Sequence, residues 1–484
     1  MGQLEDLQLS HSFLELGNDF SSRVVPVPLR NAYLIHGNEH VAETIGLDPE
    51  AFQHPTFVGC FNGEQAHPRF APLSMVYSGH QFGSYVPQLG DGRAMLLGEV
   101  KNKAGHWDLV TKGAGPTPYS RFADGRAVLR SSIREYLCSA AMSGLGIPSS
   151  QALCLIGSEE PVRRESVETG ALIVRVAQSH VRFGSFEYFS HTNQHEALKA
   201  LIDYTIQRNF PEHQASEQAI EGFFMSVVQR TALLMAQWQA VGFTHGVMNT
   251  DNMSIIGDTF DYGPFGFMDS FLPHYIPNHS DHGGRYAFDQ QPGIGLWNCR
   301  ALAYALKPVL ADEAANGILN QFESIYHEEY LRLMARKLGI TGTEKSIPEL
   351  LNPLFSMMTV DEVDYHRFFR FLSDPQSGRA QATALFRNKS GIEAWFTLYD
   401  NARPEALCPA EERSRDMKAV NPKYVLRSYL AETAIRKAED DHDHSVISEL
   451  MTVLESPFDE HPTFERYAAE PPEWSRQIEL SCSS

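Results

Sequence analysis

The sequence predicts an α+β protein in which a β-rich first part is followed by a larger helical part. In residues 85–113, and again in 151–158 and 171–179, short apolar runs alternate with polar and glycine-bearing turns, which is typical of strands. From about residue 195 to about residue 455, apolar residues recur instead at helical spacing. The chain has 484 residues, which is long enough for two or three lobes around a sizeable core.

Along the chain, these patterns predict four regions. Residues 1–75 are irregular and rich in proline, asparagine and histidine, so we expect an extension that wraps a neighbouring lobe. Residues 76–190 form the β-rich lobe, with one prominent helix expected within 123–148. Residues 191–430 form the helical lobe, and residues 431–484 are expected to form a C-terminal helical extension and tail.

Charge and cysteine content limit the function. Lys and Arg number 40 against 60 Asp and Glu, a formal net charge of -20, which repels nucleic acid and anionic membranes. A phosphate-bearing ligand would therefore need a local cluster of cations. The six cysteines lack metal-binding spacing, the first residues do not resemble a secretory signal, and no long apolar run predicts a membrane span. We therefore expect a cytoplasmic protein without a nucleic-acid or membrane partner.

One short string gives the first indication of chemistry. HGVMNTDN, residues 245–252, keeps the histidine and the asparagine of the protein-kinase catalytic loop H-R-D-L-x-x-x-N at the same spacing. Val247 replaces the catalytic aspartate, and Asp251 stands beside Asn252 instead. The tripeptide Asp261-Tyr262-Gly263 follows, where kinases have D-F-G.

Upstream of this string lie the other members of the kinase set, in the same order. They are the glycine turn LGDGR with Gly90, Gly92 and Arg93, the strand lysine Lys112 and the helix glutamate Glu135. Each one alone is an ordinary turn, surface lysine or helix face, and Met95 stands where a third glycine would complete G-x-G-x-x-G. Together, their order predicts a kinase-like, two-lobed fold.

The chemistry of a nucleotide site explains these residue types. Glycines let the backbone approach phosphates, and a lysine held by a glutamate neutralises phosphate charge. Amide and carboxylate oxygens suit Mg²⁺, so Asn252 and Asp261 are candidate metal ligands. Mn²⁺ accepts the same oxygen ligands.

Over residues 77–430, the sequence resembles the selenoprotein O family, protein adenylyltransferases with a kinase-like fold. The resemblance rests on these strings: YSGHQFGSYVPQLGDGRAMLLGE, KGAGPTPYSRFADGRAVLRSSIREYL, THGVMNTDNMSIIGDTFDYGPFGFMD, NHSDHGGRYAFDQQP and NPKYVLRSYL. It implies a pseudokinase that binds ATP in a flipped orientation and transfers AMP to Ser, Thr or Tyr hydroxyls of proteins, with release of pyrophosphate.

The resemblance also implies residue roles. Lys112, paired with Glu135, would bind phosphate; Asn252 and Asp261 would hold Mg²⁺; and Asp251 would be the general base. The rest of the nucleotide pocket would be formed by Gly90, Gly92, Arg93, Asp124, Gly125, Arg175 and Arg182.

The tail departs from the family. It ends ELSCSS, with Cys482 in place of selenocysteine, and the segment HYIPNHSD has Pro277 where a partner cysteine would be needed. We therefore do not expect the disulfide bridge that some bacterial relatives are thought to form.

Two other functions are compatible with these residues. A non-catalytic ATP-binding scaffold would explain Val247, and a conventional kinase would transfer the γ-phosphoryl group, although such enzymes usually keep the aspartate that Val247 replaces. The sequence leaves open the protein substrates, the choice between Mg²⁺ and Mn²⁺, and transfer of AMP or UMP. We expect a monomer.

Overall fold

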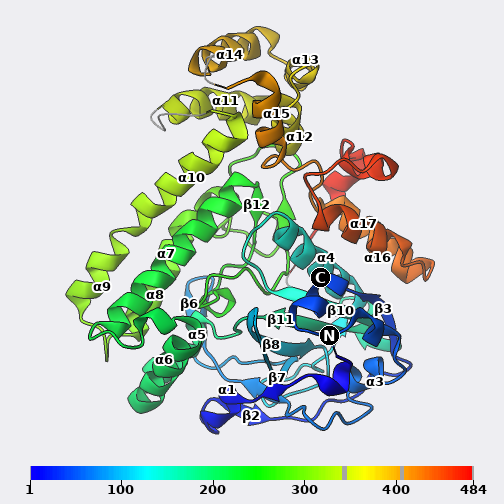
Figure 1. Ribbon diagram of the computed structural model, residues 1–484, viewed down its shortest axis with the longest axis vertical. Helices are drawn as coiled ribbons and strands as arrows, with labels where there is room; N and C mark the ends of the chain where they lie inside the picture. The colour runs from blue at the N-terminus through cyan, green and yellow to red at the C-terminus, as the bar shows by residue number, and fades with distance from the viewer. Residues whose placement is uncertain (1, 341–345, 404–407, 482–484) are drawn as a thin grey trace.

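The computed structural model describes residues 2–340, 346–403 and 408–481, and strands gather in its first part while helices fill the rest (Figure 1). The α+β class predicted from the sequence is confirmed. Cys482 lies outside the described residues, so the structure does not test whether it forms a disulfide. Cys299, the cysteine nearest to Pro277 in the sequence, is buried on a helix of the second part.

A large antiparallel sheet dominates the first part. Its main path runs β2-β4-β7-β8-β11-β10-β3, with β1 paired to β7 and β9 paired to β11. The strands are β1 (Leu9–Ser10), β2 (Ser21–Arg23), β3 (Tyr33–Gly37), β4 (Leu73–Met75), β7 (Ala94–Asn102), β8 (Gly105–Lys112), β9 (Ala127–Val128), β10 (Gln151–Arg163) and β11 (Val167–Ala177). The first 75 residues also contribute short helices, α1 (Ser12–Glu15), α2 (Glu39–Thr44) and α3 (Phe57–Asn62).

One helix, α4 (Leu129–Gly144), packs on β10 and β11. It begins later than the sequence pattern suggests, because residues 123–126 are irregular and Val128 belongs to β9, which pairs with β11. The prediction that this stretch is helical from its start is therefore wrong for its first six residues. The C-terminal helices α16 (Ser428–Asp440) and α17 (Ser445–Glu455) pack against α4 and so return to the first part of the chain (Figure 1).

The helical part is built around α7 (Ala219–Ala240), which lies alongside α10 (Phe322–Leu338) and α8 (Gln291–Ala305) (Figure 1). By length and composition alone, α7 could cross a membrane, but half of its apolar window is buried inside the molecule, as in the core helix of a globular protein. The remaining helices are α5 (Phe183–His191), α6 (His195–Asn209), α9 (Asp312–Leu319), α11 (Ile347–Asp361), α12 (Tyr365–Leu372), α13 (Gly378–Ala384), α14 (Lys389–Ala402) and α15 (Ala410–Lys418).

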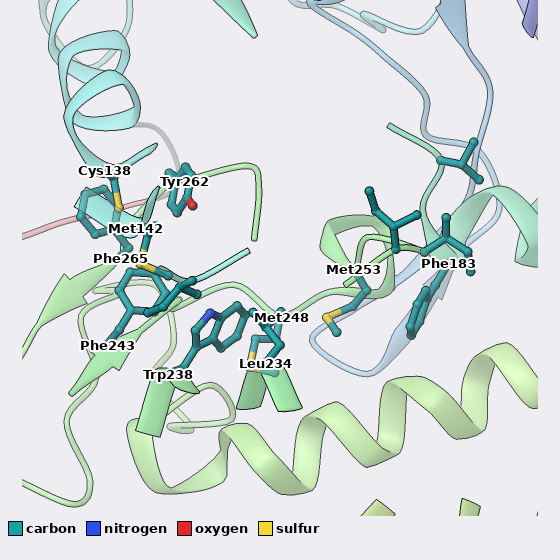
Figure 2. Packing of buried hydrophobic residues seen from close by; sticks show 14 of the residues in the cluster. Cys138, Met142, Phe183, Leu234, Trp238, Phe243, Met248, Met253, Tyr262 and Phe265 are labelled. Atoms are coloured by element: carbon teal, nitrogen blue, oxygen red, sulfur yellow. The ribbon is translucent and has the colours of Figure 1, made fainter. Parts of the chain in front are cut away.

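An apolar core holds the loop of residues 245–265 in place. The short antiparallel pair β12 (Phe243–Thr244) and β13 (Gly266–Phe267) closes this loop at its two ends. Figure 2 shows the packing beneath it, with side chains from α4, α7, β12 and the loop itself: Cys138, Met142, Leu234, Trp238, Phe243, Met248, Tyr262 and Phe265. Close packing of this kind fixes the backbone, so the polar side chains of the loop have defined positions.

A second small hairpin lies over the loop. Its strands are β5 (Gly79–Gln81) and β6 (Ser84–Val86), which pair antiparallel, and β5 packs against residues 250–252 and against α5. This hairpin connects β4 to the glycine turn before β7.

Candidate active site

A cavity of about 530 Å³ lies between the glycine turn, the ends of β8 and β11, and the loop of residues 245–265. Most of the site residues predicted from the sequence line it: Gly90, Gly92, Arg93, Lys112, Asp124, Gly125, Arg175, Arg182, Asn252 and Asp261. Val247, which replaces the kinase aspartate, also lies in its wall. Glu135 and Asp251 are outside the lining but contact residues of the site.

Lys112 and Arg175 share Glu135. The Nζ atom of Lys112, at the end of β8, lies 2.6 Å from Glu135 Oε2, and Nε of Arg175 on β11 donates to Glu135 Oε1. Strands β8 and β11 are neighbours, so both cations project from one face of the sheet toward α4, which carries Glu135. Burial, together with the neighbouring Arg175, lowers the pKa of Lys112 to about 8. A bound phosphate would favour the charged lysine.

Asp261 is held by two arginines. Its Oδ1 lies 2.7 Å from the guanidinium of Arg175, and its Oδ2 accepts a hydrogen bond of 2.8 Å from Arg182. Although burial acts to raise the pKa of Asp261, Arg175 and Arg182 hold that pKa well below its ordinary value. Asp261 has a φ of 59°, a left-handed backbone conformation that is uncommon for a residue other than glycine. The carboxylate is therefore ionised and fixed in direction.

Arg182 joins three segments of the site. Besides Asp261, it donates a 2.7 Å hydrogen bond to the backbone carbonyl of Asp251. Its guanidinium lies 4.3 Å from the ring centroid of Tyr77 and 4.8 Å from that of Phe260. Such a stacked and paired guanidinium loses little freedom when it binds an anion.

Asp251 and Asn252 differ in exposure. Asp251 is buried and accepts a 3.1 Å hydrogen bond from Gln81 of β5 at Oδ2, and burial raises the pKa of its carboxyl to about 6. Asn252 donates to the carbonyl of Val247 over 3.1 Å, which leaves its amide oxygen as the available donor toward a cation. Asn252 lines the cavity, whereas Asp251 lies behind the β5–β6 hairpin.

Two glycines of the lining are required by the geometry. Gly125 has a φ of +69°, and a Cβ atom there would lie 2.2 Å from the carbonyl group of Gly115. Gly90 has a φ of +119°, and a Cβ atom there would lie 2.5 Å from the ring of Tyr119. Both turns bring backbone up to the cavity wall where a side chain would not fit.

Sequence reasoning missed further cations of the wall, Arg126 and Arg164. Arg164 binds Asp124 with two hydrogen bonds of 2.8 and 2.9 Å, and these bonds lower the pKa of the aspartate. Arg164 stands in the turn between β10 and β11, and nothing in its local sequence indicates that it reaches Asp124, 40 residues away along the chain.

The charge of the cavity is opposite to that of the whole chain. Among the described residues of the lining, the cations are Arg93, Lys112, Arg126, Arg164, Arg175 and Arg182, and the carboxylates are Asp91, Asp124 and Asp261. In a chain of net charge -20, this excess of cations favours a polyanion such as a triphosphate.

The donor set fits a hard cation bound together with a phosphate. Within the part of the chain that the structure describes, no group of three or more His, Cys, Asp or Glu side chains could hold a metal ion alone. Asn252 and Asp261 supply two oxygen donors at the cavity wall. Mg²⁺ commonly binds to one or two protein oxygens and takes its other ligands from phosphates and water.

The chain is similar to known proteins over nearly its whole length. The model of the family described as "Protein adenylyltransferase SelO" matches residues 3–455. The chain is 49% identical over 491 residues to "Protein nucleotidyltransferase YdiU" of Myxococcus xanthus (strain DK1622), with all of both chains covered. It is 47% identical over 489 residues to the protein of the same name in Thiobacillus denitrificans, again over all of both chains. A third protein of that name, from Aliivibrio fischeri (strain MJ11), is 48% identical over 480 residues, 99% of each chain.

Proposed function

Because this chain belongs to the SelO family of protein adenylyltransferases and is a nucleotidyltransferase, we propose that its cationic cavity binds ATP and that Asp251 accepts the proton of the attacking hydroxyl. One observation carries the proposal. The Lys112–Glu135 pair, the two arginines on Asp261, and Asn252 meet at one cavity beside the glycine turn.

In this proposal, the sheet with α4 and the helical part correspond to the two lobes of a kinase-like fold. The nucleotide lies between them. The cations Lys112, Arg175 and Arg182 would bind the outer phosphates. The α-phosphate would lie toward Asn252, in keeping with the flipped orientation that the family resemblance implies.

Asn252 and Asp261 would hold the metal ion, Mg²⁺ or Mn²⁺. When bound, such an ion offsets negative charge at the phosphate under attack. The pairing of Asp261 with two arginines keeps its carboxylate ionised. Arg175 and Arg182 would also donate hydrogen bonds to the phosphates.

For transfer, the oxygen of a Ser, Thr or Tyr hydroxyl of a protein substrate bonds to the α-phosphorus, and its proton passes to Asp251. The bond from the α-phosphorus to the bridging oxygen breaks, and pyrophosphate leaves with the bonding electrons. The raised pKa of Asp251, about 6, is close to the working pH, where a general base is most effective. Val247, an aliphatic side chain in the cavity wall, cannot accept a proton.

The test compares two radiolabels. The protein is incubated with a metal ion and a mixture of candidate protein substrates, with α-³²P-ATP in one reaction and γ-³²P-ATP in the other. We expect label on protein from α-³²P-ATP only. Label from γ-³²P-ATP only would indicate an ordinary kinase, and binding of ATP without label from either would indicate a scaffold. Action as a monomer in the cytoplasm stays a prediction.

A further inference from the structure

The β5–β6 hairpin is anchored to the catalytic loop on both sides of Gln81. The backbone N–H of His80 donates to Thr250 Oγ1 over 2.7 Å. The backbone N–H of Phe82 donates to Asn249 Oδ1 over 3.3 Å and to the hydroxyl of Tyr286 over 2.9 Å. Because both neighbours of Gln81 are bound, its side chain is held at a defined place over the loop.

A side-chain contact also fixes the hairpin. Nδ1 of His80 lies 2.6 Å from Oε1 of Glu187, and the hydroxyl of Thr250 donates to the other carboxylate oxygen of Glu187. Glu187 is buried on α5, so the hairpin and the loop share one rigid support. Support of this kind is what holds a reacting group in a productive geometry.

At Asp251, this arrangement leaves the two carboxylate oxygens in different surroundings. Oδ2 accepts the 3.1 Å hydrogen bond from Gln81, whereas Oδ1 is buried and has no hydrogen-bond partner within the described residues. Oδ1 lies against Gly79, where a Cβ atom would be only 2.7 Å from it. A side chain at residue 79 would therefore collide with Asp251, so glycine lets the hairpin pack directly on this carboxylate.

We propose that Gln81 is a positioning residue, which binds Oδ2 of Asp251 and so fixes the direction of the carboxylate that takes the proton of the acceptor hydroxyl. The inference rests on the proposed function, because it assumes that Asp251 takes the proton. A glutamine amide suits this position, since it donates one hydrogen bond without placing a cation beside the carboxylate. Gln81 contacts neither nucleotide nor acceptor in this proposal and acts only through Asp251.

The test uses Gln81→Leu, which keeps the bulk of the side chain and removes the donor. The matched control is Ser84→Ala, the exposed residue opposite Gln81 in the hairpin. Single-turnover transfer from α-³²P-ATP to protein is expected to slow by roughly tenfold to hundredfold in Gln81→Leu, with KM for ATP unchanged within about twofold. Ser84→Ala should behave as the unaltered protein.

A double mutant separates positioning from general structural support. If Gln81 acts through Asp251, then Gln81→Leu should cost nothing further in an Asp251→Asn background. A full additional loss in that background, or a matching rise in KM for ATP, would overturn the inference. Full activity of Gln81→Leu, with Asp251→Asn inactive, would overturn the role of Gln81 and leave the proposed base in place. Full activity of Asp251→Asn would instead overturn the proposed base. If thermal unfolding shows that Gln81→Leu is not folded, Gln81→Met replaces it in the same comparison.

Discussion

The guanidinium of Arg175 lies 2.7 Å from the carboxylate of Asp261, and this ion pair joins the sheet to the loop that carries the site. The same arginine binds Glu135, which binds Lys112, while Arg182 holds the second oxygen of Asp261. Charges from β8, α4, β11 and the loop thus form one largely buried network. Removal of one member leaves its neighbours buried without compensation.

Asp261→Asn is therefore expected to affect both stability and activity. Loss of the carboxylate charge leaves Arg175 and Arg182 without their shared anion, which should lower the free energy of unfolding by roughly 2–4 kcal/mol. Chemical denaturation measures this change, and transfer from α-labelled ATP should be lost. Asp258→Asn, three residues earlier, is the control: burial raises the pKa of Asp258 to about 6, so a neutral amide there should be tolerated. Equal stability of the two variants would contradict the importance of the network.

Removal of the metal should separate binding from transfer. With EDTA in excess, transfer is expected to stop, because Asn252 and Asp261 then have no cation to hold. ATP should still bind, although more weakly, because the cations of the protein remain in the cavity wall. Equilibrium binding of a fluorescent ATP analogue measures ATP affinity. Re-addition of Mg²⁺ or Mn²⁺ should restore transfer. Undiminished transfer in EDTA would rule out the proposed metal ligands.

Lys112→Met should weaken ATP binding. The substitution keeps an unbranched chain at the end of β8 and removes the charge that would face the phosphates in the proposed site. We expect it to raise Kd for ATP by roughly tenfold to hundredfold. Lys101→Met on β7 is the matched control, because Lys101 is exposed on the neighbouring strand and lies outside the cavity lining. Isothermal titration with ATP compares the two variants. Equal affinities of the two variants for ATP would show that Lys112 does not bind the phosphates.

Arg164→Ala tests a residue that the sequence did not identify. Loss of its cation, and release of Asp124 from its two hydrogen bonds, should raise KM for ATP by about three- to tenfold. The effect is smaller than that of Lys112 because Arg164 is more accessible to water. Arg163→Ala, the exposed neighbour, should leave KM unchanged. A similar KM for the two variants would place Arg164 outside the nucleotide site.

Local patterns in the sequence were enough to predict part of this architecture. Apolar runs separated by a turn identified β7 and β8, which place Lys112, and helical periodicity identified the turn of α4 that carries Glu135. The sequence did not reveal that Val128 pairs in the sheet, because a two-residue strand has no periodicity. Nor could it show Arg164 beside Asp124 or Gln81 on Asp251, since these contacts join residues 40 and 170 positions apart. Such contacts depend on tertiary packing.

Away from the site, Lys337 offers a test of stability. This lysine of α10 is 3% exposed, and burial lowers its pKa from 10.5 to about 7. Its Nζ lies 4.7 Å from the ring centroid of Phe369 and 5.5 Å from that of Tyr365, contacts that offset part of the cost of the charge. Lys337→Met should therefore raise the free energy of unfolding, by roughly 2–4 kcal/mol near pH 6.

The sign of the pH dependence follows from the two pKa values of Lys337. Below about pH 7, the folded and unfolded states both carry the proton, and the folded state bears the full cost of a buried ammonium. Between about pH 7 and 10.5, the unfolded state binds more protons, so the stability of the unaltered protein rises with pH. The advantage of Lys337→Met should accordingly shrink as the pH approaches 10. Urea denaturation at several pH values measures it, with Lys199→Met on the exposed face of α6 as the control. An advantage that stays constant with pH would mean that Lys337 keeps an ordinary pKa in the folded protein.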